Sequence, residues 1–75
     1  MANPIPFAIH YLLDGVGKHF YTLTSRLDDS DAIRLATRHA ASGPENYIAL
    51  GTTREMAELM AEKVGVTKVR WNAAV

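Results

Sequence analysis

The first third of the chain contains two runs of apolar and aromatic residues, 7–13 and 18–24, with a glycine-containing break between them. Aromatic and β-branched residues are typical of strands. In the break, Gly15 and Gly17 allow the positive φ angles that a tight reversal needs. The pattern therefore predicts a β-hairpin.

The loop length predicts which residues pair across this hairpin. If Asp14 lies opposite Gly17, Leu12 faces His19, and His10 lies diagonal to His19. One face then carries Phe7, Ile9, Tyr11, Leu13, Phe20 and Thr22. The other carries Ala8, His10, Leu12, His19, Tyr21 and Leu23. This second face is too apolar to meet only water, and two helices can cover one face of a small sheet but not both.

Two later segments have the periodicity of amphipathic helices. The first begins at Asp28, a typical N-cap residue, and ends before Gly43-Pro44. Its apolar positions are Ala32, Ile33, Leu35, Ala36 and Ala40. His39 is expected at the end of this helix, beside the negative end of the helix dipole.

The second helix is predicted from a capping box in which Thr52 is the N-cap and Glu55 the third helical residue. Its expected buried residues are Met56, Leu59, Met60 and Val64. Gly65 has the place of a glycine stop. Residues 66–71 then alternate as a last strand, in which Trp71 is expected to pack under the helices.

Residues 47–50 are apolar and bounded by turn residues, which is consistent with a brief strand. The sequence does not decide whether residues 46–50 form one. The element order is then ββαβαβ. The predicted fold is one α+β domain over residues 1–75, with two layers. A small sheet of three to four strands, formed by the N-terminal hairpin and the C-terminal strand, carries two helices on one face.

Composition narrows the function classes. The 75 residues include no cysteine, which excludes disulfides, cysteine–zinc sites and a thiolate nucleophile. Eight basic and eight acidic residues give a formal net charge of zero, so no global field attracts polyanions. No segment has the length and hydropathy of a membrane span or a secretory leader. We expect a cytoplasmic protein that does not bind membranes.

Few residues indicate chemistry. His10 and His19 lie on one predicted face, but no third residue has the spacing of a metal ligand. We therefore expect no catalytic, cofactor-binding or metal-binding residue, and no enzyme activity. A basic and aromatic strip of Lys18, Lys68, Arg70 and Trp71, together with Tyr21, offers the alternative of single-stranded nucleic-acid binding.

Several short patterns resemble one protein family. These are Phe7-x-Ile9-x-Tyr11-x-Leu13-x-Gly15, Lys18-His19-Phe20, Leu27-Asp28 with Asp31-Ala32, and the run from Met60 to Trp71. Together they are similar to a family of short uncharacterised pseudomonad proteins, a domain of unknown function. The resemblance implies a small bacterial protein without an assigned activity, and it transfers no functional residues.

The sequence therefore leaves the biological role unknown and favours a small non-enzymatic interaction or regulatory module. The uncovered hairpin face predicts self-association, as a homodimer, or binding of another protein. Its candidate interaction residues are His10, Leu12, His19, Tyr21 and Leu23. The alternative is a nucleic-acid-associated accessory protein that uses the basic strip.

Overall fold

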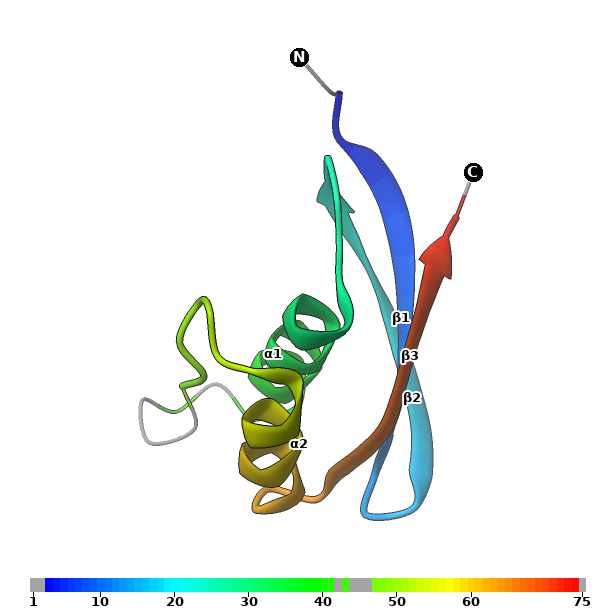
Figure 1. Ribbon diagram of the computed structural model, residues 1–75. Helices are drawn as coiled ribbons and strands as arrows, with labels where there is room; N and C mark the ends of the chain where they lie inside the picture. Colours follow the sequence, from blue (N-terminus) through cyan, green and yellow to red (C-terminus); the bar gives the residue numbers. More distant parts are fainter. Residues whose placement is uncertain (1–2, 42, 44–46, 75) are drawn as a thin grey trace.

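The computed structural model describes residues 3–41, 43 and 47–74. It contains five elements: β1 (Ile5–Leu13), β2 (Val16–Thr24), α1 (Asp29–Ala40), α2 (Arg54–Glu62) and β3 (Val66–Ala73). The strands form one antiparallel sheet in the order β2-β1-β3. Both helices lie on the same side of this sheet (Figure 1). The predicted α+β class, with two helices on one face of a small sheet, is confirmed.

The brief strand expected in residues 47–50 is absent. Residues 47–50 are irregular, and Asn46 lies outside the described residues. Figure 1 places this segment on the helix side of the molecule, away from the sheet. Ile48 is nevertheless buried in the hydrophobic core. The apolar run therefore reflected a buried side chain rather than a strand. A short apolar run does not by itself identify the secondary structure.

The hairpin turn is one residue earlier than predicted. Asp14 and Gly15 form it with φ angles of 51° and 84°, as a two-residue reversal with positive φ at both positions requires. Leu13 consequently pairs with Val16, and His10 pairs directly with His19. The predicted pairing was wrong by two residues. Because side chains alternate with a period of two, both predicted faces are still observed.

The third strand lies on the other side of β1. Ile9 pairs with Trp71 and His10 with Arg70. The register then shifts between His10 and Leu12, near Lys68, whose φ is 50°. This irregularity is a β-bulge, with an extra residue on β3.

The core lies between the helices and the covered face of the sheet. It contains the residues Ile9, Tyr11, Ile33, Ala36, Ile48, Ala57, Ala61 and Val66. The helix α2 contributes small side chains, Ala57 and Ala61, to this core. Met56 and Leu59 are 52% and 56% exposed, so their predicted burial was wrong. The fully buried stripe of α2 consists of alanines. Met60 is partly buried against the core, whereas Met56 and Leu59 lie outside it.

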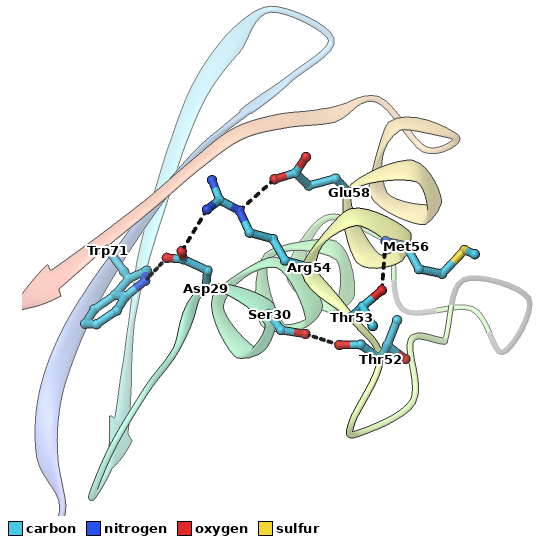
Figure 2. Close-up of polar contacts among 8 residues, drawn as sticks. All are labelled: Asp29, Ser30, Thr52, Thr53, Arg54, Met56, Glu58 and Trp71. Carbon is cyan, nitrogen blue, oxygen red and sulfur yellow. Dashed lines mark hydrogen bonds and ion pairs between the residues drawn. The ribbon is translucent and has the colours of Figure 1, made fainter.

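The helix starts follow local capping chemistry. The Asp28 side chain accepts a hydrogen bond from the Asp31 amide at 2.8 Å, as predicted. At α2 the N-cap is Thr53, which accepts from the Met56 amide, rather than Thr52 (Figure 2). The Thr52 hydroxyl instead donates to the Ala49 carbonyl. Adjacent threonines offer the same cap chemistry, and the path of the preceding loop selects between them.

The helix ends differ in their agreement with the sequence. The helix α1 stops at Ala40, before Gly43, and the Ala41 amide donates to the Thr37 carbonyl. Pro44 lies outside the described residues. Gly65 has a φ of 87° after α2, as expected of a glycine stop. Its carbonyl accepts from the Asp14 amide at 2.9 Å, which joins the hairpin turn to the α2–β3 turn.

Candidate interaction surface

The sheet face opposite the helices, here called the outer face, carries the predicted interaction residues. By pairing and alternation it contains Ala8, His10, Leu12, His19, Tyr21, Leu23, Arg70 and Asn72. Figure 1 shows no described helix on this side of the sheet. Tyr21 and Leu23 are 66% and 67% exposed, whereas the small side chain of Ala8 is buried. The outer face therefore presents large apolar side chains from β2 to solvent.

The two histidines meet on this face. His10 and His19 pair directly, and their ring centroids are 5.9 Å apart. His19 also packs edge-on against Tyr21, with a centroid distance of 6.2 Å. Within the described residues, no group of three histidine, cysteine or acidic side chains has the geometry to hold a metal ion. The histidines and Tyr21 form an exposed row of rings across β1 and β2.

Basic residues gather at the hairpin end of the sheet. A hollow of about 300 Å³ is lined by His10, Tyr11, Leu12, Gly17, Lys18, His19, Lys68 and Arg70. Lys18 comes from β2, and Lys68 and Arg70 come from β3, so the fold brings together three predicted strip residues. The strands contain no acidic residue, and every acidic position except Asp14 falls within residues 28–62. The hollow is therefore positively charged.

The fourth residue of the predicted strip, Trp71, points to the covered face. It pairs with Ile9 and packs edge-on against Phe7 at a centroid distance of 5.8 Å. Its Nε1 donates to Asp29 Oδ1 at 3.0 Å (Figure 2). Trp71 is half-buried at the rim of the helix layer. The strip predicted from the sequence is therefore divided between the two faces, because Trp71 and Arg70 are neighbours in one strand.

A second polar group joins α1, α2 and β3. Asp29, which accepts from the Trp71 indole, also forms an ion pair with Arg54 Nη1 at 3.2 Å (Figure 2). Arg54 Nε donates to Glu58 at 3.0 Å. The hydrogen bond to Glu58 raises the pKa of Arg54. These charged side chains are about half exposed, so water screens each ion pair and its contribution to the stability of the fold is small. Each of these charged side chains has a partner of opposite sign within the chain, which favours a structural role.

His39 has a role that its sequence position did not reveal. Its Nδ1 lies 2.7 Å from the Tyr11 hydroxyl oxygen, and its ring stacks on Phe20 at a centroid distance of 4.3 Å. Burial raises the pKa of Tyr11. These contacts fix the end of α1 on the β1–β2 hairpin. The sequence contained no signal for them, because His39 is distant in the chain from both partners, 28 residues from Tyr11.

The helix layer also exposes apolar side chains that the sequence prediction missed or assigned to the core. These are Tyr47, Leu50, Met56 and Leu59. Met56 and Leu59 have helical spacing, which was the only pattern the sequence offered for them. That spacing is common to a buried stripe and to an exposed one, so it did not distinguish the two.

In the part of the chain that the structure describes, no helix has both the length and the apolar character needed to cross a membrane. Comparison with curated proteins and with solved structures finds no match to this chain. A family model described as "Family of unknown function (DUF6555)" matches residues 1–74. That match covers all but one residue of the sequence and agrees with the resemblance to a domain of unknown function, so the chain belongs to the DUF6555 family.

Proposed function

We propose that the protein is a small non-enzymatic interaction module that self-associates through its β1–β2 hairpin. The observation that carries the proposal is the exposure of Tyr21 and Leu23, 66% and 67%, on a sheet face that no described helix covers. Exposed apolar side chains that lie together on a small domain are typical of association surfaces. The outer face presents side chains on an open sheet rather than an enclosed site with positioned acid and base groups.

The size of the domain supports this proposal. A domain of this length buries about 60% of the surface that its unfolded chain exposes, so a second contact surface adds substantially to its stability. The chain has no cysteine with which to stabilise the fold covalently. Full burial of a Leu side chain contributes about 1.5 to 3 kcal/mol. Association through Tyr21 and Leu23 therefore supplies apolar burial that the isolated chain lacks.

Light scattering after gel filtration, across a range of protein concentrations, tests self-association. We expect a mass that rises toward twice 8.2 kDa. Leu23→Lys should shift the protein to monomer, because it places a charge where the proposal buries an apolar group. Leu59→Lys is the matched control, since Leu59 is similarly exposed but lies on α2. A wild-type protein that is monomeric at every concentration, or two variants with the same effect, would contradict the proposal.

A second candidate function is favoured by one specific observation, the hollow lined by Lys18, Lys68 and Arg70 on strands that carry no acidic residue. Clustered cations beside aromatic rings are the usual elements of single-stranded nucleic-acid binding. In this candidate, Tyr21 supplies a stacking surface near His19. Trp71 plays no part, because its indole is held by Asp29 on the covered face.

Titration of a fluorescently labelled oligonucleotide at several salt concentrations tests this candidate. Binding should weaken steeply with salt, and Arg70→Ala should reduce the slope of the logarithmic salt plot by about one unit. Lys63→Ala is the control, because Lys63 lies at the end of α2 and outside the hollow. No binding at low salt, or equal losses in both variants, would reject nucleic acid as the partner.

A further inference from the structure

The two edges of the sheet differ in their capacity to pair with another strand. Each edge strand carries a basic residue, so charge does not distinguish the two edges. At one edge, β3 is interrupted by the bulge near Lys68, and bulges oppose edge-to-edge pairing. At the other edge, β2 pairs with β1 without a shift over nine residues, Val16–Thr24, and contains no proline. The edge of β2 is therefore the one open to another strand.

The orientation of the main chain shows which residues point outward from this edge. The Pro6 carbonyl and the Asp14 amide both form hydrogen bonds on the β3 side of β1. The main-chain N–H and C=O groups of even-numbered β1 residues therefore point toward β3. Those of odd-numbered β1 residues point toward β2 and form the hydrogen-bonded pairs Phe7–Thr22, Ile9–Phe20 and Tyr11–Lys18. It follows that the N–H and C=O groups of the odd-numbered β2 residues point to the free edge. These residues are Gly17, His19, Tyr21 and Leu23.

The helix layer leaves space beside β2. The helix α1 packs mainly against β3 and β1, and α2 packs against β3. The helix α1 reaches β2 through the stacked rings of His39 and Phe20. The ring of Phe20 is only partly buried, although it lies on the covered side of the sheet. Val16, also on β2, is 58% exposed. A strand placed next to β2 would therefore meet apolar side chains rather than a helix.

We propose that two copies of the chain pair through β2, antiparallel and centred on Phe20, to form one continuous six-stranded sheet. This inference rests on the proposed self-association and specifies its geometry. A second copy is the expected occupant because pairing of β2 with itself is a closed two-fold contact. Pairing of β2 with β3 of another copy would instead propagate, and the bulge of β3 opposes it.

The register centred on Phe20 is the one that pairs all nine residues of β2. It sets His19 opposite Tyr21 of the other copy as a hydrogen-bonded pair, formed by the main-chain groups that point to the free edge. It sets Lys18 opposite Thr22 as a non-hydrogen-bonded pair. Leu23 then lies beside Gly17, where a side chain would meet nothing within 4 Å. A register centred on residue 18 would bring two Lys18 side chains face to face, and like charges directly opposite are destabilising.

The two Phe20 rings would complete the covered side of the extended sheet. Directly opposite residues of a non-hydrogen-bonded antiparallel pair have Cα atoms about 4.5 Å apart, so their side chains are in contact. Phe20 of each copy already stacks on His39 of its own α1. The pair of phenylalanines therefore fills the space between the two helix layers, and the exposed Tyr21 and Leu23 gain neighbours on the outer face.

Disulfide trapping tests this register, because the chain has no cysteine of its own. The double variant Lys18→Cys/Thr22→Cys should form a covalent dimer with two interchain disulfides under mild oxidation. Within one copy these positions are four residues apart along a strand, about 13 Å, which is too far for a disulfide. The single variants Lys18→Cys and Thr22→Cys are the controls and should remain largely uncrosslinked, since neither position meets itself across the two-fold axis.

A proline variant tests the main-chain pairing independently. His19→Pro removes an N–H that points to the free edge, and proline is tolerated there within a monomer. We expect its dimer dissociation constant to rise at least about tenfold relative to His19→Thr, which keeps the N–H. Circular dichroism of both variants monitors the fold, and the cross-linking result stands if His19→Pro does not fold.

The outcomes separate this inference from the proposed function. A wild-type protein that stays monomeric overturns self-association and the pairing together. A wild-type dimer in which the double cysteine variant cross-links no more than the single variants overturns the β2 pairing alone. That second result would assign the dimer to stacking of the outer faces, in which Leu12→Lys should weaken association.

Discussion

Alternate residues of the same strands lie on the two faces of the sheet, and the two faces have different environments. One face packs against the helices, and the other is exposed. On the covered face, Ile9 is 0% exposed and contacts the helix layer, while its neighbour His10 is exposed on the outer face. The covered face holds the aromatic contacts of Tyr11 and Trp71 with α1 and its neighbours. The outer face holds rings, cations and large apolar side chains, and no helix among the described residues lies over them. Stability therefore depends on one face, and the other is free for association.

The largest expected effect is at the centre of the covered face. Ile9→Ala should lower the free energy of unfolding by about 2 to 5 kcal/mol, because it removes buried methyl groups and leaves a cavity. Urea denaturation followed by Trp71 fluorescence measures the change. A loss below about 1 kcal/mol would show that the covered face is not the main source of stability.

A smaller effect is expected at the turn that joins the end of the sheet to α2. Gly65→Ala should cost about 1 to 2 kcal/mol, because Gly65 has a φ of 87° and a Cβ there would overlap the Asp14 carboxylate. The Asp14 side chain is able to rotate away, so the backbone conformation sets the estimate. Gly17→Ala is the control, since a Cβ at Gly17 meets nothing within 4 Å. Equal losses in the two variants would refute the constraint at Gly65.

The rim of the covered face should contribute less again. Trp71→Phe removes the hydrogen bond from Nε1 to Asp29 but keeps an aromatic ring near Phe7. We expect a loss of about 0.5 to 1.5 kcal/mol in thermal or chemical unfolding. Arg70→Ala changes the next residue, on the outer face, and should have a smaller effect. The opposite order would place the stabilising contacts of β3 on the outer face.

The smallest effect on the isolated chain is expected on the outer face. Leu23→Ala should change the free energy of unfolding of the monomer by no more than about 0.5 kcal/mol, because the side chain is already exposed. Denaturation at low protein concentration measures the monomer, and a repeat at high concentration includes association. A variant that is less stable only at high concentration sharpens the contrast between the faces. A large loss of unfolding free energy at low concentration would contradict the contrast, because the outer face would then stabilise the monomer.

The sequence predicted the elements through local chemistry. Alternation and the glycine break predicted the hairpin, and the Asp28 cap with helical spacing predicted α1. The assignment of residues to the two hairpin faces was correct even though the register was wrong by two residues, because face membership depends only on odd or even position. The same independence from tertiary contacts explains why Gly65 was correctly expected to end α2.

Other features depended on how the elements pack. Sequence spacing did not show that α2 turns Ala57 and Ala61 inward and leaves Met56 and Leu59 outside. The choice of Thr53 over Thr52 as N-cap was equally undetermined, because both threonines have suitable side chains. In the candidate site, the sequence grouped Lys18, Lys68 and Arg70 by charge alone, whereas the hollow that they line and the position of Trp71 outside it depend on the sheet order.

The sequence by itself determined the hairpin, the two helices and the last strand, which residues share a face of the hairpin, and the absence of cysteine chemistry. Each of these follows from periodicity or composition, which neighbours along the chain define. Only the tertiary structure decided that β1 is central and β2 lies at a regular free edge, and that His39 meets Tyr11 and Phe20. Those contacts join residues distant in the chain, and their selection depends on packing energy shared among all the elements at once.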